Sequence, residues 1–165
     1  MMDKLDIRYT ELKDFEYLLT WLNDPDNNKW FPFSTSQEIE ESAKNWINFS
    51  RYKSSLTGVV DNKVCAIGTL FLMPYRKLIH HCMFYMIVDK KYRNHGIGST
   101  MLKNLINLGQ NYFKLESIFT EVFENSPMIP LLEKFKFNQF AKQENFIKID
   151  DNHYLARILF DIWFK

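Results

Sequence analysis

The sequence contains little cysteine and almost no net charge. Two cysteines in 165 residues cannot build a disulfide framework or a four-ligand zinc site, so we expect two buried thiols in a reducing compartment and no metal cofactor. The 21 Lys and Arg residues balance 20 Asp and Glu residues, leaving a net charge of +1. Proteins whose main role is to bind nucleic-acid phosphates usually carry a larger basic excess, so a nucleic-acid partner is disfavoured.

Long hydrophobic runs are also missing. The longest run, residues 65–74, is about half of the roughly 18 residues needed to span a membrane, and it contains Gly68. Residues 1–6 include no apolar core of the kind found in signal peptides. We therefore expect a cytoplasmic protein without a membrane partner, folded as a single domain over residues 1–165.

Aromatic residues are abundant instead. Phe, Tyr and Trp make up 16% of the chain, and 15 of these residues are Phe. Rings in this number indicate a large aromatic core, a ring-lined pocket, or both.

Hydrophobic spacing predicts a mixed α/β fold. Leucines and Phe15 repeat with helical period over residues 12–22, and Thr35 with Glu38 forms a capping-box pattern before a second helix. Asp61-Asn62 is a hairpin signal between two strands. Further helices are expected over residues 101–112 and after Ser126-Pro127. The predicted strands are residues 5–10, 56–60, 64–72, 81–88, 117–123, 137–141, 146–149 and 154–163. This pattern predicts a mixed β-sheet with helices on its faces.

The stretch from residue 87 to residue 102 carries the clearest functional signal. An apolar strand ends there, a short basic turn follows, and Gly96 and Gly98 open an amphipathic helix. Free amide groups at the start of a helix, together with the helix dipole, form a binding site for an anion such as pyrophosphate. The third glycine of a dinucleotide fingerprint would fall at Met101, and no Gly-Lys-Ser/Thr occurs, so neither common nucleotide motif is present.

Residues Arg93-Asn94-His95-Gly96-Ile97-Gly98 resemble the Arg/Gln-x-x-Gly-x-Gly/Ala signature of the Gcn5-related N-acetyltransferase (GNAT) family, whose members bind acetyl-coenzyme A (acetyl-CoA). Asn125 and the block at residues 131–137 are similar to a later motif of that family. The opening, in which a helix ends at residues 21–25 before Trp30 and Phe31, resembles the branch of ribosomal-protein, polyamine and sugar acetyltransferases.

This resemblance implies a GNAT-like fold, in which a central mixed sheet is flanked by about four helices. It also implies direct transfer of an acetyl group from acetyl-CoA to a primary amine, either a protein N-terminus or a small molecule. The pantetheine arm would lie beside the strand that ends at Val88, whose N–H would polarise the thioester carbonyl. The residues that the resemblance assigns to the cofactor are Met86, Ile87, Val88, Arg93, Asn94, His95, Gly96, Ile97, Gly98, Ser99 and Asn125.

The match departs from the family at the catalytic acid. A tyrosine that protonates the leaving thiolate in many members is replaced by Leu132, and a family glycine is replaced by Lys136. Ser126 or water is an alternative proton donor. The Leu132 replacement also leaves open a non-catalytic module that binds acyl-CoA.

Two residues are candidates for the general base that deprotonates the amine. Glu121 lies on the strand before Asn125, near the place where some relatives carry a catalytic glutamate. His81 opens the central strand, although a structural strand histidine is the commoner outcome for such a position.

The acceptor pocket is expected to form from the loop between the first two helices and from the last strands. Its candidate lining residues are Trp30, Phe31, Tyr85 and Tyr154. The acidic and aromatic loop around Trp30 suits a cationic or amphipathic acceptor. The oligomeric state, monomer or homodimer, is left open.

Overall fold

The computed structural model describes residues 4–164 and contains a seven-stranded sheet with five α-helices in that part of the chain. The strands are β1 (Asp6–Tyr9), β2 (Ser55–Val60), β3 (Lys63–Leu72), β4 (His81–Val88), β5 (Ser117–Phe123), β6 (Asn138–Asp150) and β7 (His153–Trp163). The helices are α1 (Phe15–Asn23), α2 (Pro25–Asn28), α3 (Ser36–Ile47), α4 (Ile97–Asn107) and α5 (Met128–Lys134). The strand order is β1-β2-β3-β4-β5-β7-β6. The β4–β5 pair is parallel and the other five pairs are antiparallel, so the predicted mixed sheet is confirmed.

Local signals located several elements correctly. Asp61 and Asn62 both adopt positive φ angles, +50° and +61°, as a tight hairpin turn requires. The Thr35 hydroxyl accepts a hydrogen bond from the Glu38 N–H at 3.2 Å, and the Glu38 side chain returns to the Thr35 N–H. The predicted capping box at the start of α3 is therefore confirmed.

Three elements differ from the sequence prediction. The expected loop at residues 23–33 contains the short helix α2, which Asp24 caps and Pro25 starts. The helix expected from Leu12 begins at Phe15, after a single 3₁₀ turn. The two strands predicted at residues 137–141 and 146–149 are parts of one strand, β6. Its middle is polar and exposed on a hairpin, so it lacks the apolar alternation that predicts a strand.

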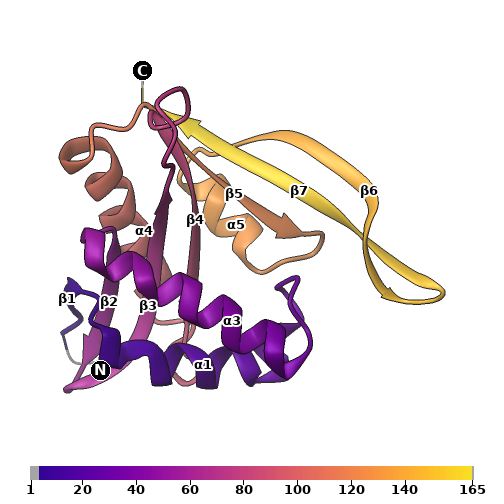
Figure 1. Cartoon of the computed structure of the whole chain (residues 1–165), viewed down its shortest axis with the longest axis horizontal. Helices are drawn as coiled ribbons and strands as arrows, with labels where there is room; N and C mark the ends of the chain where they lie inside the picture. The colour runs from indigo at the N-terminus through magenta and orange to yellow at the C-terminus, as the bar shows by residue number, and fades with distance from the viewer. Residues whose placement is uncertain (1–3, 165) are drawn as a thin grey trace.

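Helices cover both faces of the sheet, and the β6–β7 hairpin projects beyond them (Figure 1). Helices α1 and α3 pack Leu18, Leu22 and Trp46 against Ile67 and Ile87 on one face. On the other face, α4 and α5 bury their apolar residues in a larger core. That core includes Met101, Leu102, Leu105, Leu132, Ala66, Leu70, Phe84 and Met86. The N-terminal halves of α4 and α5 thereby approach the C-terminal end of β4.

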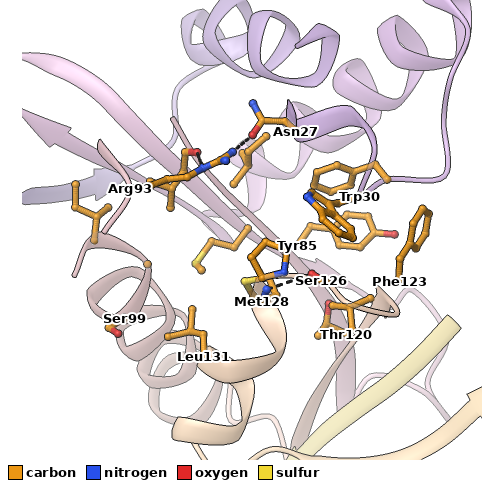
Figure 2. Close-up of a pocket in the computed structure, with 18 of the residues that line it drawn as sticks. Asn27, Trp30, Tyr85, Arg93, Ser99, Thr120, Phe123, Ser126, Met128 and Leu131 are labelled. Atoms are coloured by element: carbon orange, nitrogen blue, oxygen red, sulfur yellow. Dashed lines mark hydrogen bonds between the residues drawn. The ribbon is translucent and has the colours of Figure 1, made fainter. Parts of the chain in front are cut away.

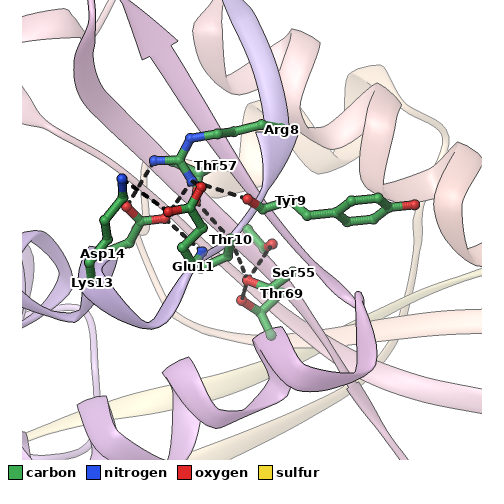
Figure 3. Close-up of polar contacts among 10 residues, drawn as sticks. Arg8, Tyr9, Thr10, Glu11, Lys13, Asp14, Ser55, Thr57 and Thr69 are labelled. Atoms are coloured by element: carbon green, nitrogen blue, oxygen red, sulfur yellow. Dashed lines mark hydrogen bonds and ion pairs between the residues drawn. The ribbon is translucent and has the colours of Figure 1, made fainter.

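A buried polar cluster ties the start of the chain to the sheet (Figure 3). Arg8 donates two hydrogen bonds to Asp14, at 2.8 and 2.9 Å, and Thr57 donates a third at 3.0 Å. The Asp14 side chain is 1% exposed. Burial opposes its ionisation, but these hydrogen bonds and one from the Glu11 N–H together lower the pKa of Asp14.

The same cluster continues through hydroxyl groups to α3. The Ser55 hydroxyl donates to Thr10 at 2.8 Å and lies 2.6 Å from the Thr69 hydroxyl. Thr69 in turn accepts the indole N–H of Trp46 at 2.6 Å. Every polar side chain in this cluster thus has a partner, which allows it to stay buried between β1, the sheet and α3.

We expect Asp14→Ala to lower the free energy of unfolding at pH 7 by roughly 2–4 kcal/mol, because Arg8 and Thr57 lose an ionised acceptor. A lowered pKa gives stability that is present above the unfolded value and lost as the pH falls through the folded value. The difference from wild type should therefore shrink below about pH 4. Urea unfolding at pH 7 and pH 2.5 measures it, with exposed Asp6→Ala as the control. An equal difference at both values would contradict the assignment.

Candidate active site

The site begins where two neighbouring strands stop pairing. β4 and β5 are paired over three positions only, from His81 opposite Ser117 to Met83 opposite Phe119. β4 remains paired with β3 up to Val88, so its other edge, facing β5, has no strand partner beyond Met83. Backbone N–H and C=O groups on this edge are available to an extended ligand.

Side chains brace the opening between the two strands. The Thr120 hydroxyl donates to the Phe84 carbonyl at 2.7 Å, where a continued backbone pairing would otherwise have been. One residue further along each strand, the Tyr85 hydroxyl donates to Glu121 Oε1 at 2.9 Å. These two bonds hold the strands at a fixed separation without closing the gap.

The gap is the floor of a cleft of about 360 Å³ (Figure 2). Its wall on one side is the loop after α2, and on the other side the start of α4 and of α5. The lining residues are Asn27, Trp30, Phe31, Pro32, Tyr85, Met86, Ile87, Val88, Tyr92, Arg93, Asn94, Gly96, Ile97, Gly98, Ser99, Thr120, Glu121, Val122, Phe123, Ser126, Pro127, Met128 and Leu131. The cleft therefore combines an aromatic end with a glycine-containing turn.

The turn between β4 and α4 presents backbone amides to the cleft. Gly96, the N-cap of α4, has a φ of +80° and no side chain that could cap the helix. The Thr100 N–H is the first donor within the helix, bonding to the Gly96 carbonyl at 3.1 Å. The amides of residues 97–99 precede it and have no acceptor in the helix, as an anion site requires.

An ideal Cβ on Gly98 would lie between the walls of the cleft. Its nearest neighbours would be Leu131 Cδ2 at 3.5 Å and Met86 Cε at 3.8 Å, which are ordinary contacts. The fold itself thus leaves room for a side chain at this position. A glycine there instead leaves a cradle that fits a phosphate group approaching the amides.

Arg93 is held at this turn by neutral groups. Its Nε donates to the Val88 carbonyl at 3.3 Å, and its Nη2 donates to the side-chain carbonyl of Asn27. Lys90, in the same turn, pairs with Asp24 at 2.9 Å. Sequence reasoning missed Asn27, because its contact joins segments 66 residues apart and no local pattern marks it.

Glu121 lies at the aromatic end of the cleft with both carboxylate oxygens engaged. Oε1 accepts from Tyr85, and Oε2 accepts from Arg157 Nη1 at 3.0 Å. Arg157 also bonds to Gln143 and stacks over the Phe146 ring, 4.0 Å from its centroid. Burial and the adjacent Glu121 carboxylate raise the pKa of Tyr85, so its phenol stays protonated.

The two departures from the family motif have structural explanations. Leu132 is fully buried in the core below α5 and does not line the cleft. Lys136 has a φ of +66°, which is the conformation that a glycine adopts without strain. Ser126 does line the cleft, where its hydroxyl oxygen accepts the Met128 N–H at 3.1 Å.

The structure brings most of the sequence-predicted residues together. Those that line the cleft are Met86, Ile87, Val88, Arg93, Asn94, Gly96, Ile97, Gly98, Ser99, Glu121, Ser126, Trp30, Phe31 and Tyr85. Four others do not line it. His81 lies at the paired end of β4, and Tyr154 lies on the projecting β6–β7 hairpin opposite Lys148. His95 is exposed, and Asn125 is an exposed turn residue with a φ of +67°.

The structure gives no support to His81 as the base or to Tyr154 as an acceptor contact, because strand register places both away from the opening.

Neither cysteine is suited to covalent catalysis. Burial, together with the Asp89 charge, raises the pKa of Cys65 to about 11, and burial raises the pKa of Cys82 to about 12. Both thiols are free and buried, as predicted.

Comparison with known proteins agrees with the family resemblance of the sequence. The sequence model of the acetyltransferase (GNAT) family matches residues 15–137. L-amino acid N-acetyltransferase AaaT of Escherichia coli (strain K12) is 21% identical over 165 residues, which cover 95% of this chain and 99% of that protein.

Solved structures share the fold. Ribosomal-protein-alanine N-acetyltransferase from Brucella melitensis has a TM-score of 0.82 at 19% identity, covering 96% of this chain and 99% of that one. The acetyltransferase yncA from Salmonella typhimurium, determined with its cofactor acetyl-CoA, has a TM-score of 0.81 at 11% identity, covering 99% and 95%.

Because the family match spans more than half of the chain, this protein belongs to the GNAT acetyltransferase family and is an N-acetyltransferase. The predicted fold class is confirmed by these neighbours. Within residues 4–164, no helix is long and apolar enough to cross a membrane.

We expect Gly98→Glu to weaken coenzyme A (CoA) binding at least 100-fold, because a carboxylate would occupy the phosphate cradle. The melting temperature should change little, since the Cβ contacts are ordinary. Calorimetric titration with CoA measures the affinity. Thr100→Glu places the same charge at an exposed position of the same helix and should bind like wild type. Wild-type affinity in Gly98→Glu would show that phosphate lies elsewhere.

Proposed function

We propose that this protein transfers the acetyl group of acetyl-CoA to a primary amine bound in the cleft between β4 and β5. The observation that carries the proposal is the unpaired edge of β4, which leads directly to the uncapped N-terminus of α4. An extended amide-containing arm followed by a pyrophosphate matches that order of groups. Acetyl-CoA supplies the activated acetyl group as a thioester.

The residues of this chain fit the two halves of that co-substrate. Met86 offers its backbone N–H and C=O to the pantetheine arm, and Val88 offers its N–H; Ile87 between them pairs with Ile67 of β3. The amides of residues 97–99 and the Arg93 guanidinium suit the pyrophosphate. Two positions assigned to the cofactor by sequence, His95 and Asn125, do not line the cleft, and we assign no contact to their side chains.

The acceptor end favours a small molecule with a primary ammonium group next to an apolar portion. Trp30, Phe31, Tyr85 and Phe123 supply rings there, and Glu121 supplies the carboxylate. Free amino acids fit this description, and the E. coli relative is named as an L-amino acid N-acetyltransferase. A peptide N-terminus offers the same ammonium, as the name of the B. melitensis protein suggests.

Proton transfers follow from the same groups. Glu121 accepts a proton from the acceptor ammonium, which leaves a neutral amine. The amine nitrogen then bonds to the thioester carbonyl carbon as the carbon–sulfur bond breaks, with the Val88 N–H polarising the carbonyl. On forming the amide the nitrogen loses its second proton to water. Ser126 donates its hydroxyl proton to the departing thiolate and is reprotonated through that water. In this assignment Ser126 takes the role that a tyrosine has in many family members, whose position in this chain is Leu132.

A cytoplasmic location suits the two free thiols and the substrate, and we include it in the proposal. The oligomeric state is not part of it.

An amine panel tests the proposed function. Thiol release from acetyl-CoA is followed with L-amino acids, an alanine N-terminal peptide, spermidine and glucosamine. We expect at least one primary amine to raise the rate more than tenfold above hydrolysis, with an acetylated amine as the product. CoA binding without release for any amine would instead indicate a binding module.

We expect Glu121→Gln to lower kcat by about 10²-fold, because the amide cannot take up a proton. The affinity for CoA should remain within twofold of wild type, since Glu121 lies at the acceptor end. Glu124→Gln is the matched control: this carboxylate follows β5 directly and bonds to the Ala156 N–H outside the cleft. Full turnover by Glu121→Gln across pH 6–9 would assign the base elsewhere.

A further inference from the structure

Asn27 is a buried polar residue that connects two separate segments of the cleft wall. Asn27 is one of the buried polar residues of the fold and is 3% exposed. The Asn27 Nδ2 donates to the Trp21 carbonyl at 3.0 Å, and Oδ1 accepts from Arg93 Nη2. The Asn27 backbone carbonyl also accepts the Trp30 N–H at 3.1 Å.

These contacts fix the orientation of the Asn27 amide. A guanidinium only donates hydrogen bonds and a backbone carbonyl only accepts them. The oxygen must therefore face Arg93, and the nitrogen must face Trp21. With Nε bound to Val88, the guanidinium is held at two of its five N–H groups, and three remain for a ligand.

The partners of Arg93 differ in charge from those of its neighbour. Lys90 is paired with two carboxylates, Asp24 at 2.9 Å and Asp26 at 3.8 Å. Arg93 is held by the carbonyl oxygens of Asn27 and Val88, and within residues 4–164 no ion pair joins it to a carboxylate. The Asp24 carboxylate also acts on Arg93 electrostatically, but both hydrogen-bond acceptors of the guanidinium are neutral.

We propose that Asn27 is a positioning residue for the co-substrate: its neutral amide holds the Arg93 guanidinium at the phosphate turn without cancelling its charge. An aspartate at position 27 would still accept from the guanidinium but would neutralise it, and it would lose the bond donated to the Trp21 carbonyl. The inference rests on the proposed binding of the CoA pyrophosphate at this turn. It makes a residue of the α2 segment part of the cofactor site.

The decisive variant is Asn27→Asp, because it keeps an oxygen acceptor for Arg93 and adds a negative charge beside it. Calorimetric titrations with CoA are carried out at 50 and 500 mM NaCl. If charge retention matters, Asn27→Asp weakens binding at least tenfold at 50 mM, and its affinity changes less with salt than that of wild type. If Asn27 only holds the loop, Asn27→Asp loses no more affinity than Asn28→Asp and keeps the salt dependence of wild type, and the proposal is overturned.

Asn28→Asp is the matched control. Asn28 lies one residue along and donates to the Leu22 and Phe33 carbonyls, at 3.2 and 2.9 Å, without touching Arg93. It adds the same charge and removes two bonds of the same segment, and it should stay within threefold of wild type. A loss equal to that of Asn27→Asp would assign the effect to loop disruption or to general charge, against the proposal.

A double-mutant cycle covers the case in which Asn27→Asp does not fold. Asn27→Ala and Arg93→Gln are each expected to weaken CoA binding, and the double variant should bind within twofold of Arg93→Gln alone. Additive losses would show that Asn27 acts independently of Arg93 and would overturn the inference. Failure of the wild-type protein to bind CoA would overturn the proposed function itself, which is a distinct result.

Discussion

The site depends on the parting of β4 and β5 in the middle of the sheet. β5 pairs with β7 over its full length, Ser117 to Phe123, but with β4 over only three positions. It therefore follows the long β6–β7 hairpin away from β4 (Figure 1). A central strand with an unpaired edge is normally costly, because its backbone groups need partners. Here Thr120 satisfies the Phe84 carbonyl and Arg93 the Val88 carbonyl, and the groups between them are left to water or to a ligand.

Local sequence signals located most of the elements and the glycine-containing turn between β4 and α4. The Asp61-Asn62 turn, the Thr35 capping box and the glycine at position 96 each depend on neighbours within a few residues. Residue types alone predict such features, since positive φ angles and helix caps have specific preferences. The continuous β6 was missed because an exposed hairpin does not need the apolar alternation from which strands are recognised.

Residues whose role depends on register could not be placed from sequence. His81 opens the same strand that carries Tyr85, yet it lies four positions of extended chain, roughly 3.3 Å each, before that cleft residue. Asn125 matches a family motif, but its left-handed backbone gives it a local reason to be asparagine. Asn27 and Arg157 gain their importance from partners 66 and 36 residues away. Only the tertiary structure reveals such pairs.

The two ends of the cleft treat charge in opposite ways. At the acceptor end the Glu121 carboxylate is compensated by Arg157 and by the Tyr85 phenol, so an incoming ammonium competes with groups already present. At the proposed phosphate turn the hydrogen-bond partners of Arg93 are neutral and Asp24 acts on it only without a direct ion pair, so an anion meets less competition there. This asymmetry favours firm binding of the anionic co-substrate and weaker binding of the amine. Such an order suits the proposed reaction, because an ammonium has no lone pair and too stable an ion pair with Glu121 would raise the barrier to forming the reactive neutral amine.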